Sequence, residues 1–94
     1  MFYQQGDVIV EKVLETKGKK LNHLILATGE ATGHNHCITE GDAILYEHEG
    51  TLFLRVESDT ATLTHQEHTA ITLPKGDYKI SRVREYDHSQ DQRE

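Results

Sequence analysis

The sequence has few of the residues that cross-link a chain or hold it in a membrane, and each shortage excludes a class of protein. Cys37 is its only cysteine, so no disulfide can form within the chain. The segment from Met1 to Asp7 has no basic residues and no apolar run, so it does not resemble a signal peptide. No stretch approaches the ~20 apolar residues that a membrane-spanning helix needs. We therefore expect a protein of the reducing cytoplasm that does not bind membranes.

Positive charge is also scarce. The chain has 10 lysine and arginine residues against 16 aspartate and glutamate residues, which gives a formal net charge of −6. Because tight binding of long DNA or RNA depends mainly on neutralised phosphates, we do not expect a long nucleic acid as partner. A small anionic ligand held by a local basic pocket is compatible with this charge.

Tryptophan is absent and no window shows sustained helical periodicity, whereas Val, Ile, Leu, Thr and Tyr recur throughout the 94 residues. This composition favours strands over helices. A chain of this length forms one small domain, for which a homodimer would add buried area. The predicted fold is all-β, a small antiparallel barrel or sandwich of about eight short strands. Residues 1–86 are expected to form this single domain and residues 87–94 a disordered tail.

Alternating apolar and polar residues predict where the strands lie. They are expected over residues 7–14, 23–27, 43–47, 51–57, 60–65, 69–73 and 77–86. Within 51–57, Leu52 and Leu54 are expected to face inward and Phe53 outward. Ser58-Asp59 predicts a turn, and the segment from Pro74 to Asp77 is the strongest turn signal in the chain.

Histidine is the one reactive residue that occurs in clusters. His34 and His36 follow a glycine-rich turn, and His65 and His68 follow about thirty residues later, so these clusters hold four of the seven histidines. In an extended segment His34 and His36 must point to the same face. His65 shares the apolar face of its predicted strand, which suggests partial burial. Imidazole serves both proton transfer near neutral pH and metal binding, so the pattern predicts a histidine site with either chemistry.

Three short motifs, spread over most of the chain, resemble those of a family of small phage and mobile-element proteins: Gly29-Glu30-x-Thr32-Gly33-His34-x-His36, His65-x-Glu67-His68-x-x-Ile71-x-Leu73-Pro74-x-Gly76-x-Tyr78, and Arg84-Glu85-Tyr86. That family is in turn similar to the broad-spectrum CRISPR-associated ring nucleases. The resemblance implies an enzyme, a phosphodiesterase that degrades cyclic oligoadenylate second messengers of type III CRISPR systems without a metal or other cofactor. In a phage such a hydrolase would act as an anti-CRISPR protein.

Cleavage of this kind needs no protein nucleophile, because the ribose 2′-hydroxyl can attack the neighbouring phosphorus. The protein must supply a base, an acid and positive charge. We expect His34, His36 and His68 to be the catalytic residues. The residues expected to bind substrate are Lys19, Lys20, Gly33, His65, Arg82, Arg84 and Tyr86. The ligand would be a small cyclic oligonucleotide, and its symmetry would suit a homodimer.

Three alternatives remain open at this point. His34, His36, His65 and His68 could instead bind a metal ion, with Glu40 or Glu67 as a further ligand; the spacing from His36 to Glu40 matches the first motif of cupins, although a second cupin motif is not recognisable. The protein could also bind a nucleotide signal without cleaving it. Finally, the histidines could be structural, which is the expectation for His23 and His48, while His88 belongs to the predicted tail.

Overall fold

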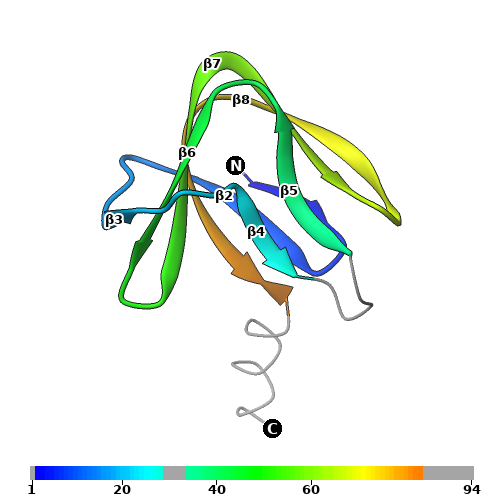
Figure 1. Cartoon of the computed structure of the whole chain (residues 1–94), viewed down its shortest axis with the longest axis horizontal. Coiled ribbons are helices and arrows are strands. Elements are labelled where there is room, and N and C mark those ends of the chain that lie inside the picture. The colour runs from blue at the N-terminus through cyan, green and yellow to red at the C-terminus, as the bar shows by residue number, and fades with distance from the viewer. Residues whose placement is uncertain (1, 29–33, 84–94) are drawn as a thin grey trace, which may run out of the picture.

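The computed structural model describes residues 2–28 and 34–83, which form one antiparallel sheet of eight strands (Figure 1). The strands are β1 (Phe2–Gln5), β2 (Val8–Val13), β3 (Lys19–Lys20), β4 (Ile25–Thr28), β5 (Asn35–Glu40), β6 (Ala43–His48), β7 (Thr51–His65) and β8 (His68–Arg82). Their order in the sheet is β1-β2-β8-β7-β5-β4, and β6 pairs with both β7 and β3. The predicted all-β class and antiparallel pairing are confirmed. No helix in the described part of the chain is long and apolar enough to cross a membrane.

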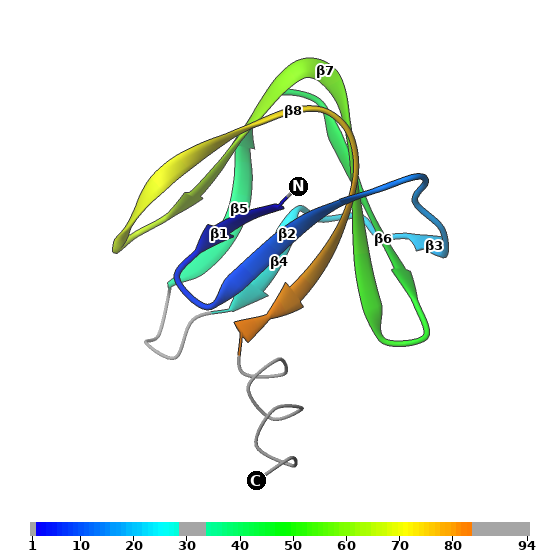
Figure 2. The ribbon, with the colours of Figure 1, turned by 180° about the vertical axis from the view of Figure 1, so that it is seen from behind.

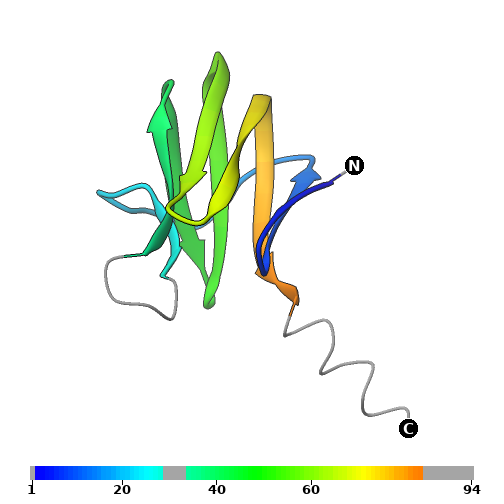
Figure 3. The same ribbon diagram turned by 90° about the vertical axis from the view of Figure 1, so that its right-hand side faces the viewer.

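The sheet curls into a half-barrel rather than lying flat (Figure 2). Seen from the side, β1, β2 and the end of β8 form one wall, and β4, β5 and β6 form the other (Figure 3). β7 and β8 bend over between the two walls and connect them (Figure 1). Two of the three shortest strands, β1 and β3, were not among those expected from the sequence.

The bend occurs where the sequence predicted turns, and the prediction that strands end there is wrong. β7 and β8 each run for 15 residues through Ser58-Asp59 and Pro74–Asp77. Val56 pairs with Gly76 and Thr60 with Pro74, so three residues of β7 oppose one of β8 in a bulge. Proline lacks a backbone donor and is tolerated at such bulges. The turn-forming residues therefore bend the strands instead of ending them.

The backbone donors released by the bulge find acceptors in the neighbouring turn between β5 and β6. The amides of Glu57 and Ser58 donate to the carbonyl oxygen of Asp42 at 2.8 and 3.3 Å. Ser58 Oγ in turn accepts from the Asp42 amide at 2.9 Å. These bonds hold the bend and satisfy the amides of Glu57 and Ser58.

The core lies on the concave face of the sheet. Leu45, Leu54, Leu63, Leu73 and Tyr78 are each 0% exposed there. Burying a side chain of this size contributes roughly 1.5–3 kcal/mol, so the concave face supplies most of the stability of so small a domain. Leu54 faces inward as predicted.

Phe53 points to the opposite, convex face, as predicted, but it is only 7% exposed. The loop of residues 14–18, here called the crossover loop, covers it. The chain must pass β8 and β7 to carry β3 from β2 to its partner β6. The Thr16 amide donates to Asp77 Oδ2 at 3.1 Å and fixes the loop on the way.

Candidate functional site

The four histidines of the two sequence clusters meet at one end of the half-barrel, and we call them the histidine cluster. His36 lies on β5, which pairs with β7, and the turn after β7 places His68 opposite His65. The ring centroid of His65 lies 4.2 Å from that of His36, 4.6 Å from that of His68 and 5.8 Å from that of His34. His65 is therefore the central imidazole, in contact with the other three.

His36 is the buried member of the cluster, at 2% exposure, and Gln5 fixes its tautomer. The Gln5 amide nitrogen donates to the carbonyl oxygens of Leu63 and Thr69, at 3.0 and 2.9 Å. The Gln5 Oε1 atom is therefore an acceptor and lies 2.9 Å from His36 Nδ1. Because an amide oxygen cannot donate, Nδ1 must carry the proton and Nε2 the lone pair.

The surroundings of His36 also keep it uncharged. Its pKa is lowered from the usual 6.5 to about 4, mainly by burial and also by the neighbouring His65, His68 and Arg82, against a raising effect of Asp7. Burial removes the hydration that a charged imidazolium needs, so it disfavours protonation. His36 is neutral at pH 7.

Asp7 and Arg82 border the cluster next to His36. Asp7 Oδ1 lies 3.8 Å from His36 Nε2, and Asp7 Oδ2 lies 3.3 Å from Arg82 NH1. Arg82 NH2 also donates to the carbonyl oxygen of Thr28 at 3.1 Å. The arginine predicted to bind substrate is thus adjacent to the histidines, with part of its charge compensated by Asp7.

The turn between β7 and β8 orients the more exposed histidines. Glu67 Oε2 lies 3.3 Å from Nδ1 of His34, whose side chain is 26% exposed. Because a carboxylate only accepts, this contact favours the proton on Nδ1 and leaves Nε2 with a lone pair. The Glu67 amide donates to His65 Nδ1 at 3.0 Å, and Gln66 Oε1 accepts from the Asn35 amide at 2.9 Å. Both imidazoles are thereby held by one short turn.

His68 packs against Gly6, in the turn between β1 and β2. A Cβ atom placed on Gly6 would lie 2.6 Å from His68 Nε2, and the backbone of Gly6 has a φ of +61°. Glycine is required here twice, for the left-handed backbone and for the close approach. The turn at Gly6-Asp7 therefore brings a flat surface against the cluster as well as the Asp7 carboxylate.

Other residues expected at the site lie elsewhere. Lys19 and Lys20 form β3, where they pair with Glu47 and Tyr46 of β6. Figure 1 shows β3 at the opposite side of the molecule from the β7–β8 turn. Lys19 and Lys20, which were expected to bind substrate, therefore do not lie beside the histidines, because the crossover loop carries them to β6. Gly33, Arg84 and Tyr86 lie outside the described residues, as does the predicted tail with His88.

Two further histidines, His23 and His48, contact residues near them in the chain. His23 Nδ1 accepts from the Ile25 amide at 3.1 Å. His48 lies 3.9 Å from Glu49 at the turn between β6 and β7. Neither side chain belongs to the histidine cluster.

The imidazoles do not form a set of metal ligands in this arrangement. Within residues 2–28 and 34–83, no three His, Cys, Asp or Glu side chains are placed to hold one ion. The rings lie against one another, with those of His36 and His68 stacked at an interplanar angle of 14°. Glu40, expected as a further ligand, instead accepts a hydrogen bond from Thr62 Oγ1 at 3.4 Å.

A family profile described as a domain of unknown function (DUF8820) matches residues 4–83. The chain belongs to this family. No curated protein and no solved structure matches it. The part of the chain that matches the DUF8820 profile includes the whole histidine cluster together with Gln5, Asp7 and Arg82.

Gln5 and Asp7 are the site residues that the sequence did not indicate. They precede His36 by about thirty residues, and no spacing rule connects a glutamine in one strand to a histidine in another. The Gly6-Asp7 turn was recognisable from the sequence, but its position against His68 depends on the order of strands in the sheet. Only the pairing of β1, β2 and β8 brings these residues to the cluster.

Proposed function

We propose that this protein is a metal-independent phosphodiesterase that opens cyclic oligoadenylates through their ribose 2′-hydroxyl groups. The observation that carries the proposal is the meeting of four imidazoles in different environments. His34 is oriented by the Glu67 carboxylate through Nδ1, and His36 is held neutral beneath the cluster. General acid–base catalysis needs imidazoles whose environments differ in this way.

His34 acts as the base in this mechanism. Its Nε2 takes the proton of the 2′-hydroxyl, whose oxygen forms a bond to the adjacent phosphorus. The P–O bond to the 5′-oxygen of the next nucleotide breaks, and that oxygen must gain a proton. The products are a 2′,3′-cyclic phosphate and a free 5′-hydroxyl. Glu67 has the role of the carboxylate that orients the imidazole of a catalytic triad.

His68 is the acid that protonates the leaving 5′-oxygen, because its side chain is exposed at the other side of the central His65. His65 Nδ1 already accepts a hydrogen bond, so its Nε2–H is free to donate to a phosphoryl oxygen. Arg82 adds positive charge next to the cluster. Such preorganised donors stabilise the charge that develops on the phosphorane.

His36 has a different role from the catalytic one expected for it. At 2% exposure its ring does not reach a substrate, so it is a positioning residue beneath His65 and His68. Its neutral form keeps a second positive charge away from the acid. The catalytic residues in this proposal are therefore His34 and His68, with His65 and Arg82 binding the phosphoryl group.

The same proposal includes the biological setting. A phage protein with this activity would remove the cyclic oligoadenylate signal of a type III CRISPR system in the host cytoplasm and act as an anti-CRISPR. A homodimer would match the rotational symmetry of the ring. The resemblance of the histidine motifs to those of ring nucleases supports this setting.

The test is incubation of the purified protein with labelled cyclic tetra-adenylate and hexa-adenylate, with and without EDTA. Cleavage that survives EDTA and yields a 2′,3′-cyclic phosphate is the expected result. Ligand bound and recovered intact would identify a non-cleaving binding protein instead. Cleavage abolished by EDTA, with stoichiometric metal in the protein, would favour the metal alternative. Absence of binding would exclude cyclic oligoadenylates as ligands.

The matched control is His48→Ala, because His48 also faces a glutamate but lies outside the cluster. Its rate should equal that of the unaltered protein. A contaminating nuclease would cleave equally in His34→Ala and His48→Ala, and this outcome would contradict the proposal.

A further inference from the structure

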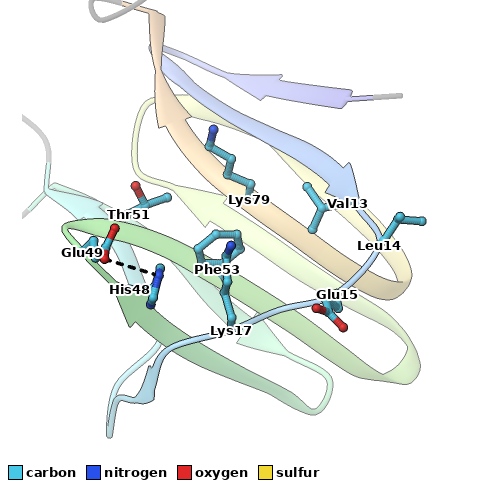
Figure 4. Close-up of a pocket in the computed structure, with 9 residues that line it drawn as sticks. All are labelled: Val13, Leu14, Glu15, Lys17, His48, Glu49, Thr51, Phe53 and Lys79. Carbon is cyan, nitrogen blue, oxygen red and sulfur yellow. Dashed lines mark ion pairs between the residues drawn. The ribbon is translucent and has the colours of Figure 1, made fainter.

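A cleft of about 470 Å³ lies between the crossover loop and the convex face of the sheet (Figure 4). The loop carries Glu15 and Lys17 across the strands that hold Phe53 and Lys79 (Figure 4). Small-molecule sites in proteins typically enclose ~300–1,000 Å³. The size of this cleft therefore suits a small ligand.

The floor of the cleft is aromatic. Phe53 is 7% exposed, but it lies on the face opposite the core cluster and is not part of it. Lys17 Nζ lies 6.0 Å from the centroid of its ring, and Val13 also lines the cleft. Because the lysine side chain over the ring is flexible, its movement can expose part of the ring face to a planar ligand.

The cations beside this floor are not neutralised. Lys79 is the cross-strand neighbour of Phe53. Within residues 2–28 and 34–83, neither Lys17 nor Lys79 forms an ion pair or hydrogen bond. Two acidic residues, Glu15 and Glu49, also line the cleft, and Glu49 lies 3.9 Å from His48. Among the described residues neither carboxylate is paired with Lys17 or Lys79, so both ammonium groups are available to an anion.

Leu14 lies at the mouth of the cleft and is 101% exposed. A leucine that contacts nothing in the free protein does not gain the ~1.5–3 kcal/mol of stabilisation that burial of such a side chain can contribute. A ligand seated on Phe53 would come next to it. The cleft therefore combines an exposed leucine at its mouth, an aromatic ring at its floor and unpaired ammonium groups. These features suit a small planar aromatic anion.

We propose that the crossover cleft binds a small planar aromatic anion, with its ring on Phe53 and its carboxylate or phosphate between Lys17 and Lys79. Lys17 leaves the face of Phe53 when the ligand enters, and Leu14 closes over the edge of the ring. This binding site is separate from the histidine cluster and does not rest on the activity proposed for it.

Binding is tested by amide chemical shifts during titration with naphthoate, an aromatic carboxylate. Naphthamide, which keeps the ring without the charge, and cyclohexanecarboxylate, which keeps the charge without the aromatic ring, are the matched probes. Saturable shifts confined to residues 14–18, 51–53 and 79 are expected with naphthoate, at an affinity ~10-fold or more above that of either probe. No saturation, or equal affinity for all three, would overturn the proposal.

The variants Lys79→Gln and Phe53→Leu should each weaken naphthoate binding ~10-fold. Lys12→Gln is the control, because Lys12 Nζ also lies over an aromatic ring, that of Tyr78 at 5.6 Å, but does not line the cleft. Its affinity should not change. Thermal melting shows whether Phe53→Leu remains folded, and if it does not, Lys79→Gln and Lys17→Gln decide. Unchanged affinity in both lysine variants would place the ligand elsewhere.

Discussion

The histidine cluster and the crossover cleft are built on the same two strands, β7 and β8, but they differ in how their polar groups are satisfied. In the cluster, Gln5 makes three hydrogen bonds and His36 is buried against it. In the cleft, Lys17 and Lys79 have no anionic partner among the described residues. A closed polar network holds its groups in fixed orientations, whereas unpaired charges beside an aromatic ring are available to a ligand. The following predictions test this difference, from the largest expected effect to the smallest.

Replacing His34 with Ala should lower the rate of cyclic oligoadenylate cleavage by at least ~10²-fold, because the base is removed. The free energy of unfolding should change little, because the side chain is partly exposed. Single-turnover rates and urea denaturation of the same samples measure the two effects. Glu67→Gln should retain more activity than His34→Ala, because it removes only the group that orients the ring. Full activity in His34→Ala would remove this residue from the mechanism.

Replacing Gln5 with Ala should lower the free energy of unfolding by roughly 2–4 kcal/mol, because two buried carbonyl oxygens and His36 Nδ1 lose their partner. Gln4→Ala is the control. Gln4 Nε2 also donates to a carbonyl oxygen, that of Gly6 at 3.0 Å, but the bond is exposed. Urea denaturation should give a change within about 0.5 kcal/mol for Gln4→Ala. Equal effects would show that the network around His36 does not hold the fold.

Stability should depend on pH through His36. Its pKa is about 4 in the folded protein and 6.5 in the unfolded chain, so between these values only the unfolded chain holds the proton. Stability should therefore fall as the pH is lowered from about 6.5 to about 4, by up to ~1.4 kcal/mol per pH unit, and should level off below. Denaturation midpoints across this range measure the slope. His36→Gln should flatten it, and His23→Gln, which changes an exposed histidine, should not.

Replacing Gly6 with Ala should cost more than replacing Gly50 with Ala. Both have a left-handed backbone, with φ of +61° and +83°, so both lose ~1–2 kcal/mol of backbone energy. A Cβ on Gly6 meets His68, whereas one on Gly50 meets nothing within 4 Å. The difference between the two free energies of unfolding isolates the contact with the histidine ring. Gly6→Ala should also shift the ring proton signals of His68, and identical behaviour of the two variants would contradict the described packing.

The smallest change in stability is expected for Leu14→Gln, within about 0.5 kcal/mol, because this side chain contacts nothing in the free protein. Its affinity for naphthoate should nevertheless fall. A loss of stability with no loss of affinity would show that Leu14 packs in the fold rather than against a ligand.

Local rules predicted the parts of the site that lie close together in the sequence. Strand alternation placed His34 and His36 on one side, and both rings contact that of His65. The same rules failed where the answer depends on the curl of the sheet. His65 was expected to be partly buried, and it is, but strand alternation did not indicate that Gln5 and the first turn bury His36.

In the fold, too, local features were predicted correctly, whereas features that depend on long-range strand pairing were not. The composition predicted an antiparallel β structure of about eight strands, and this is confirmed. The sequence correctly indicated an irregularity at Pro74–Asp77, but it predicted a turn where the strand continues past a bulge. Turns and bulges use the same residue types, and the pairing partner decides which of them forms. The positions of Lys19 and Lys20 depended on which strand β3 joins, and nothing in their own segment specifies β6.

The bulge at residues 57–59 interrupts the hydrogen-bond ladder between β7 and β8 and separates the pairing of residues 52–56 from that of residues 60–63. Cooperative opening spreads along an unbroken ladder and stops where pairing is interrupted. Amide hydrogens of residues 60–63, on the side of the histidines, should therefore exchange with solvent in one unit, and those of residues 52–56, on the side of the cleft, in another. A ligand that slows exchange in one part would leave the other unprotected, so the two ends of a single hairpin can respond to different molecules.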